Sequence, residues 1–110
     1  RLKVDTTKIT CSKKEFLDAA QAEGVLMIAD YHYALPSTFT WYKERRVFGQ
    51  QGFPWTNPEY KGDRDAVYEI PNALKAIDEH FNLHVYESWG DEEVNQVLDA
   101  FEKVYEVYRA

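Results

Sequence analysis

Two clusters of side chains in this sequence are suited to ligand chemistry, and the first is centred on His32. This histidine stands between two tyrosines, three positions after the apolar run of residues 25–29 ends. Because the run is short and β-branched, it predicts a buried strand. Strand ends at the edge of an α/β sheet are where ligands tend to bind. Of the three histidines, His32 is therefore the best placed to contact a ligand.

The second cluster is the basic tetrapeptide Lys43-Glu44-Arg45-Arg46, which lies among aromatic residues. A guanidinium group matches the geometry of a carboxylate or a phosphate, so an anion-binding site is one interpretation. A salt bridge to another domain or subunit is an equally good one. The cluster is too small and too closely flanked by acids to predict a nucleic-acid patch.

No complete set of catalytic residues accompanies these clusters. The sequence has no glycine-rich phosphate loop, no GxSxG motif and no paired-carboxylate motif. Cys11 has no neighbouring base to activate it, and no lysine is visibly set up as a desolvated Schiff-base amine. His32, His80 and His84 lack the spacing and the accompanying ligands of a metal site. We therefore expect neither a catalytic residue nor a metal site on this chain alone.

Composition and charge exclude several classes of protein. With 45% hydrophobic and 29% charged residues the sequence is typical of a globular protein, and no apolar run approaches the roughly 18 residues of a membrane span. Residues 71–110 hold nine acidic residues against three basic ones, which accounts for the net charge of −6. Such a surface repels phosphate backbones. We expect no membrane and no nucleic-acid partner, and the single cysteine favours a reducing, cytoplasmic location.

The first half of the chain predicts a strand, a helix and a second strand. Residues 2–10 alternate and are rich in β-branched side chains, which predicts a strand. Ser12 and Glu15 have the spacing of a capping box, so a helix begins there, and Gly24 provides its left-handed end. The second strand is the apolar run at residues 25–29.

The last 40 residues predict a helix, a strand and a final long helix. Pro71 opens the first helix, and residues 81–86 alternate as a strand with Phe81, Leu83 and Val85 on its buried face. The final helix begins at Gly90 or Asp91, and we expect its apolar stripe to be buried against the sheet. The stripe comprises Val94, Val97, Leu98, Phe101, Val104, Tyr105 and Tyr108. These elements predict an α/β (α+β) sandwich, a small mixed or mostly antiparallel sheet with helices packed on one face.

Residues 37–70 predict a long aromatic insert. Eight of the seventeen aromatic residues fall in this segment, and no helical or strand period holds across it. Disordered linkers are poor in aromatic residues, and loops longer than about 15 residues are uncommon unless they serve a site or an interface. We expect a single domain, residues 1–110, in which this insert is the main functional surface.

Several short motifs resemble the C-terminal domain of the DegT/DnrJ/EryC1/StrS aminotransferases. The family's segment at the cleft is similar to the first part of this chain. There, a capped helix is followed by a Gly-Val turn and by a strand that runs into His32-Tyr33. The segment from Phe81 to Val94 looks like its closing stretch, again followed by an amphipathic helix. The resemblance spans nearly the whole chain in order. Ser37 replaces the second histidine of the family's motif and Tyr86 the histidine of its closing motif, which indicates a divergent branch.

The resemblance implies the small domain of a fold type I enzyme that uses pyridoxal phosphate to aminate a keto-sugar or a nucleotide-linked sugar. The Schiff-base lysine would lie in a large N-terminal domain, so we expect this chain to be a piece of a longer polypeptide, the full enzyme to be a homodimer, and the piece alone to be inactive and to hold no cofactor tightly. The substrate would be contacted by His32, Tyr33, Arg45, Arg46 and Trp55. Lys43 and the two arginines would hold an anionic group, and Trp55 or Trp41 would stack on a sugar or base.

Two other interpretations stay open. The chain could be a free-standing ligand- or protein-binding module that uses the aromatic loop at residues 37–70, since aromatic residues are enriched at interfaces. It could also be an oligomerisation domain in which the apolar stripe of the final helix faces another chain.

Overall fold

The structure is a computed structural model that describes residues 1–49 and 51–110. Contacts between residues divide it into two compact units. Unit 1 comprises residues 1–30 and 73–110, and unit 2 comprises residues 31–72. Unit 2 includes the whole of the predicted insert. The expectation of a single domain with an insert stays a prediction.

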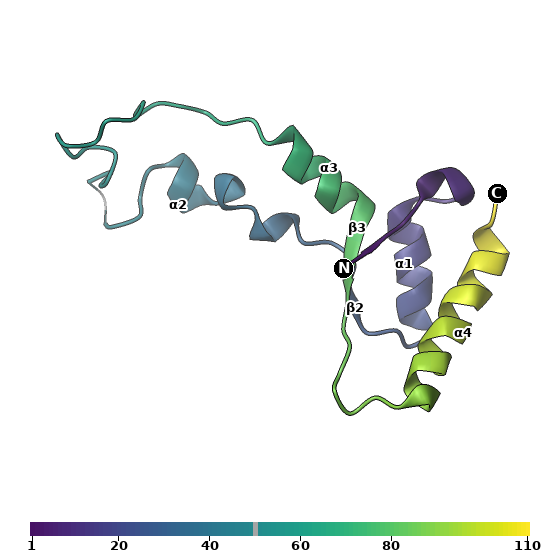
Figure 1. Cartoon of the computed structure of the whole chain (residues 1–110). Helices are drawn as coiled ribbons and strands as arrows, with labels where there is room; N and C mark the ends of the chain where they lie inside the picture. Colours follow the sequence, from purple (N-terminus) through teal and green to yellow (C-terminus); the bar gives the residue numbers. More distant parts are fainter. Residues whose placement is uncertain (50) are drawn as a thin grey trace. The chain divides into compact units, whose positions relative to one another are not determined.

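Unit 1 is a mixed α+β unit built around a small antiparallel sheet (Figure 1). Its strands are β1 (Leu2–Lys3), β2 (Met27–Ile28) and β3 (His80–Leu83). Their order is β1-β3-β2, so β3 pairs with both neighbours, with Leu2 opposite Phe81 and Met27 opposite Leu83. The sequence predicts a small sheet, either mixed or mostly antiparallel, and the structure shows the antiparallel form.

The strand predicted for residues 2–10 is wrong beyond Lys3. The chain instead turns at Asp5 into the 3₁₀ helix η1 (Thr6–Lys8). The Asp5 carboxylate accepts hydrogen bonds from the Thr7 backbone N–H (3.1 Å) and hydroxyl (2.6 Å). Local bonds of this kind compete with a strand ladder and stabilise turns. Only Ile9 regains a strand-like contact, an isolated bridge to Arg109.

The strand predicted for residues 81–86 ends early. β3 stops at Leu83, and the Val85 side chain, expected on the buried face, is 70% exposed. The buried face is therefore limited to Phe81 and, in part, Leu83. β2 is likewise shorter than the apolar run at residues 25–29 that predicted it.

The first helix, α1 (Lys13–Ala22), begins and ends as the sequence predicts. The Ser12 hydroxyl accepts a hydrogen bond from the Glu15 N–H (3.2 Å), and the Glu15 carboxylate accepts one from the Ser12 N–H (3.0 Å). Two N–H groups that the first turn leaves without helical partners are thus satisfied. Gly24 follows the helix with φ of 96°, the left-handed conformation that glycine adopts without steric cost.

Three further α-helices lie in the described part of the chain. α2 (Thr40–Lys43) is a short helix within the predicted insert. α3 (Pro71–Glu79) starts at the predicted proline. α4 (Asp91–Tyr108) starts at Asp91, one of the two predicted positions. The Lys13 ammonium donates to the Ile77 (2.7 Å) and His80 (3.0 Å) carbonyls. It thereby ties the start of α1 to the end of α3.

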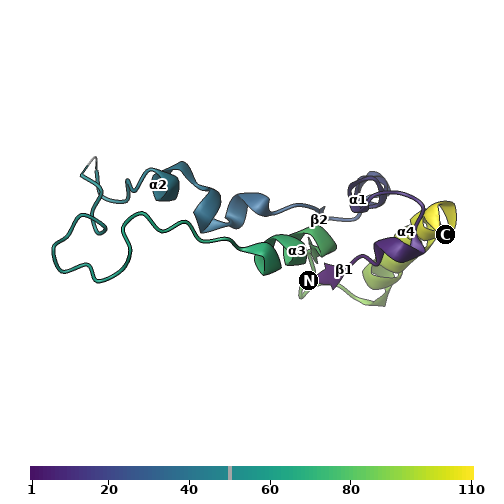
Figure 2. The same cartoon turned by 90° about the horizontal axis from the view of Figure 1, so that it is seen from above.

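The core of unit 1 lies between α1, α4 and the strands. In both views α1 and α4 lie on the same side of the strands (Figure 2). The Phe101 ring of α4 stacks on Phe16 of α1 (6.4 Å between centroids) and lies 5.8 Å from Phe81 of β3. The buried residues form one hydrophobic cluster: Val4, Ile9, Phe16, Leu17, Ala20, Val25, Met27, Phe81, Ala100 and Val104.

The apolar stripe of α4 is only partly buried, contrary to the prediction that the sheet covers it. Val104 is buried and Val97 packs against the core, because α1 lies along that side. Leu98 is 58% exposed, and Val94 and Tyr105 are 43% and 40% exposed. The apolar stripe of α4 is too wide for α1 and the short strands to cover completely.

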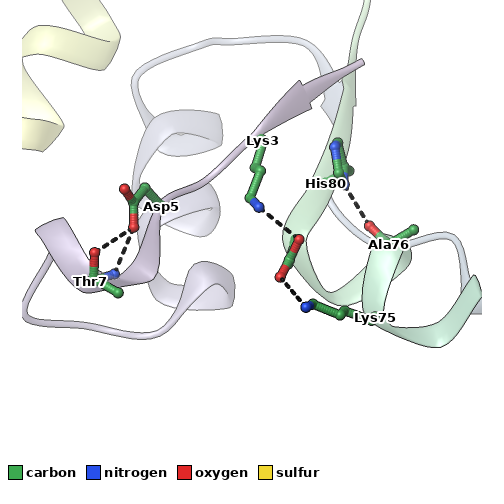
Figure 3. A network of polar contacts seen from close by, with 7 residues as sticks. Lys3, Asp5, Thr7, Lys75, Ala76 and His80 are labelled. Carbon is green, nitrogen blue, oxygen red and sulfur yellow. Dashed lines mark hydrogen bonds and ion pairs between the residues drawn. The ribbon is translucent and has the colours of Figure 1, made fainter. Parts of the chain in front are cut away.

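A group of polar contacts lies beside β1 and β3 in unit 1 (Figure 3). The Lys3 ammonium pairs with Glu79 (2.8 Å), and Lys75 lies 4.0 Å from the same carboxylate. His80 Nδ1–H donates to the Ala76 carbonyl (2.8 Å), the role expected of a histidine at a helix end. In the part of the chain that the structure describes, no helix is long and apolar enough to cross a bilayer.

Candidate functional site

Unit 2 contains all five residues that the sequence predicts to contact a substrate, and the structure brings two of them together. The Arg45 guanidinium carbon lies 5.0 Å from the centroid of the Trp55 ring and 4.9 Å from that of Tyr42. Tyr42 and Trp55 themselves meet edge to face at 6.0 Å. Such contacts between a guanidinium and aromatic faces are favourable.

The Arg45 side chain is already engaged within its own loop. Nη1 donates to the Tyr42 carbonyl (3.1 Å), Nη2 to the Ala66 carbonyl (2.6 Å) and Nε to the Arg64 carbonyl (3.3 Å). The residues it joins lie about twenty positions apart in the sequence. Arg45 therefore holds the two sides of the aromatic loop together, a role that the sequence did not indicate.

The backbone of Arg45 adopts an unusual conformation at the end of α2. Its φ is 57°, in the left-handed region that L-residues other than Asn and Asp rarely enter. The Arg46 N–H donates to the Trp41 carbonyl (2.7 Å) and the Arg45 N–H to the Tyr42 carbonyl (3.2 Å). This is a Schellman motif at the end of α2, with arginine where glycine is usual. The side-chain contacts offset the backbone cost.

The other basic residues of the tetrapeptide are more accessible. Arg46 pairs with Glu44 at 3.1 Å, and both side chains are about half exposed. Lys43 is exposed and makes no ion pair among residues 1–49 and 51–110. An anionic ligand at this cluster would therefore meet Lys43 and Arg46, whereas Arg45 would position them.

His32 and Tyr33 lie on a different element. Both belong to the 3₁₀ helix η2 (His32–Ala34), which follows the buried Tyr31 and precedes the 3₁₀ helix η3 (Pro36–Thr38). The His32 ring is half-buried, and Tyr33 is 64% exposed. Tyr33 thus has a free aromatic face, although no strand leads directly into the pair as predicted.

The aromatic residues of unit 2 form a chain of ring contacts at its surface. Phe39 stacks on Trp41 (5.9 Å), and Trp41 meets Tyr42 at 5.8 Å. Phe48 and Phe53 form a second pair at 5.9 Å. Exposed apolar patches of this kind mark contact surfaces for ligands or proteins. The exposed large apolar residues of unit 2 are Tyr33, Trp41, Val47, Phe48, Phe53, Val67 and Tyr68.

The chemistry available to these residues is recognition. Aromatic faces next to cations suit a ligand with a flat or sugar-like ring and a negative charge. Cys11, in unit 1, is half-buried, and burial raises the pKa of its thiol, which makes it a poor nucleophile. Among the described residues no group of three histidine, cysteine or acidic side chains is placed to hold a metal ion.

The lysines in the described part of the chain are not placed to form a Schiff base with pyridoxal phosphate. A lysine that forms a Schiff base has to be desolvated or to lie beside another cation. Every lysine in the described part of the chain is exposed or half-buried, and the half-buried one, Lys13, donates to two backbone carbonyls. This chain's lysines are therefore not arranged for that cofactor.

Comparisons with known proteins do not identify a family. No protein-family model, no curated protein and no solved structure matches the chain.

Proposed function

We propose that this chain is the small C-terminal domain of a pyridoxal-phosphate-dependent aminotransferase that acts on a keto-sugar or a nucleotide-linked sugar in the cytoplasm. The observation that supports the proposal is the combination of a three-stranded antiparallel sheet and helices in unit 1 with an ordered aromatic loop in unit 2. The link to the DegT/DnrJ/EryC1/StrS family rests on the resemblance of the short sequence motifs around His32-Tyr33 and from Phe81 to Val94. The chemistry belongs to the cofactor, and this domain supplies contacts to the substrate.

In this proposal each predicted site residue of unit 2 has a defined task. Arg46, with Lys43 beside it, attracts the negative charge of a nucleotide-linked sugar. Trp55 and Tyr42 clamp Arg45, which keeps the loop in the conformation that presents those cations. Tyr33 offers an exposed ring for stacking, and His32 lies beside it in the same helical turn.

The decisive experiment traps the cofactor on its lysine. The parent enzyme, as its gene encodes it, is reduced with borohydride in the presence of pyridoxal phosphate, and the labelled peptide is identified by mass spectrometry. We expect the label on a lysine outside residues 1–110. A label on one of the eight lysines within them, or a gene that encodes no further polypeptide, would contradict the proposal.

A free-standing binding module is the second candidate, and the exposed rings of unit 2 favour it. On that interpretation the 110-residue chain binds its ligand without any other polypeptide. Titration with nucleotide-linked sugars, followed by tryptophan fluorescence, separates the two. Saturable binding by the chain alone favours the module, whereas binding only by the parent enzyme favours the aminotransferase domain.

A further inference from the structure

A hollow in unit 1 is lined by none of the predicted site residues and has no role in the proposed function. It has a volume of about 360 Å³ and lies where β1 and η1 face α1, β3 and α4. Its floor is formed by three phenylalanines and branched aliphatic residues. The apolar lining residues are Leu2, Val4, Ile9, Phe16, Phe81 and Phe101.

Beside the hollow, α4 exposes a strip of apolar side chains. Tyr105 lines the hollow next to Phe101, and Leu98 and Val94 follow at intervals of three and four residues toward the start of the helix. Residues with this spacing share one helix face. From Val94 to Tyr105 the apolar strip extends for about 16 Å at the rise of an α-helix. We call the hollow and this strip together the α4 groove.

The two sides of the α4 groove differ in charge. On α4 the strip is bordered by Glu102, four residues after Leu98 and three before Tyr105, and Asp99 lies one turn before Glu102, on its side away from the strip. Neither acid makes an ion pair in the described part of the chain. The opposite side carries both signs, because the Lys3 ammonium pairs with Glu79 (Figure 3) and Lys8 follows Asp5 in η1, where its backbone N–H donates to the Asp5 carbonyl. The groove is therefore negative along α4 and balanced elsewhere.

We propose that the α4 groove binds a basic amphipathic helix supplied by a separate polypeptide. A straight apolar strip with a deeper hollow at one end fits a helix that presents residues at i, i+3, i+4 and i+7, with its largest side chain in the hollow. The unpaired acids select lysine or arginine on the flank of that helix. A second copy of α4 would bring acids against acids, which disfavours self-association. The proposal does not depend on the aminotransferase assignment.

The test uses a synthetic helix of leucine and lysine, with the 18-residue length of α4, and the intact 110-residue chain. A matched peptide replaces each lysine with glutamate and keeps the leucine face. We expect the lysine peptide to bind, to lose affinity as salt is raised, and to shift the NMR signals of Leu98 and Tyr105. The glutamate peptide should not bind.

Variants separate binding in the groove from general attraction to an acidic protein. We expect Leu98→Ala to weaken binding about tenfold, as truncation of a central anchor does. The double variant Asp99→Asn/Glu102→Gln should weaken it and reduce its salt dependence. Val107→Ala is the control, because Val107 is also an exposed apolar residue of α4 (71%) but lies outside the strip. Both Leu98 and Val107 are exposed, so neither variant should impair folding.

Several results would overturn the proposal. Equal affinity of the Leu98→Ala and Val107→Ala variants would place the peptide elsewhere. A dimer of the 110-residue chain that Leu98→Ala dissociates would make a second copy the occupant. Slower hydrogen exchange of residues 98–105 in the parent polypeptide than in the 110-residue chain, without any added peptide, would show that the groove is already covered in cis. None of these results bears on where the cofactor is attached.

Discussion

At the scale of single residues, Arg45 was predicted to contact a ligand, and in the structure its side chain binds backbone carbonyls of its own loop. Its guanidinium donates to three backbone carbonyls and lies against two aromatic rings. The sequence marked the basic cluster and the aromatic residues correctly as neighbours. It could not show that Arg45 adopts a left-handed backbone, since nothing in the residue type favours that conformation.

Substitutions of Arg45 separate the side-chain contribution from the backbone cost. Arg45→Ala loses the three hydrogen bonds and keeps the strained backbone, so residues 40–46 should exchange amide hydrogens faster. Arg45→Gly loses the same bonds but removes the strain, which recovers about 1 kcal/mol relative to alanine. Hydrogen exchange at the Arg46 amide measures both. If the glycine variant exchanged faster than the alanine variant, the left-handed conformation would be wrong.

Two glutamates at helix starts link the stability of unit 1 to pH. The backbone N–H of Ser12 lowers the pKa of Glu15 from its ordinary value of 4.5, and the N–H of Gly90 does the same for the pKa of Glu93. A carboxylate with a lower pKa in the folded state stabilises the fold above its unfolded pKa. That contribution is lost as the pH falls below 4.5 and through the folded value.

We therefore expect the double variant Glu15→Gln/Glu93→Gln to lower the thermal midpoint at neutral pH and to flatten its fall below pH 4.5. Circular dichroism melts across this range measure the effect. Glu102→Gln is the matched control, because Glu102 borders the exposed strip of α4 and has no capping role. A double variant with the same pH profile as this control would exclude the capping contribution.

At the scale of elements, α1, α3 and α4 could be predicted from the sequence, while the strands could not be bounded. Helix starts are determined by local bonds, such as those between Ser12 and Glu15, and local bonds follow from local sequence. Strand length depends on a partner elsewhere in the chain. Thr6 and Thr7 have high β propensity, yet the Asp5 carboxylate turns the chain before a longer ladder with β3 can form.

The candidate site was predictable in part for the same reason. Aromatic and basic residues close together in sequence indicated a contact surface, and Arg45 and Trp55 do meet in space. The carbonyls that hold Arg45 come from residues 64 and 66, some twenty positions later. No spacing rule connects them. The α4 groove was missed because the stripe appeared to need no more than the sheet to cover it.

The packing of α1 on α4 gives a quantitative test of the core. Leu17 has no exposed surface, so Leu17→Ala should reduce the free energy of unfolding by about 2–5 kcal/mol. Leu98→Ala truncates the same side-chain type at a site that is 58% exposed. This variant should change the free energy of unfolding by about 0.5 kcal/mol at most. Denaturant melts measure both. Similar values for the two variants would contradict the assignment of α4 faces.

At the scale of the whole molecule, the hydrophobic cluster lies entirely within unit 1, whereas unit 2 is held by ring contacts and by Arg45. Unit 2 exposes half of its large apolar side chains. Two units held by such different interactions should also differ in stability, since local stability follows buried apolar contact. The segment assigned to recognition is then the less stable of the two.

We expect unit 1 to fold without the aromatic loop. Replacing residues 37–70 with a flexible Gly/Ser linker of about 10 residues removes no member of the hydrophobic cluster. The thermal midpoint of unit 1 should change by about 4 °C or less, which corresponds to roughly 1 kcal/mol. Loss of cooperative melting in this variant would show that unit 2 is part of the core.

The strand order also determines when this protein can assemble as it emerges from a ribosome. β3 is the centre of the sheet and comes last in sequence, so β1 and β2 have no neighbour in the sheet until residues 80–83 have been synthesised. The Phe101 ring, which joins α1 to β3, arrives later still. Nascent chains that stop before α4 should consequently be protease-sensitive and prone to capture by chaperones, because their apolar strands lack a partner.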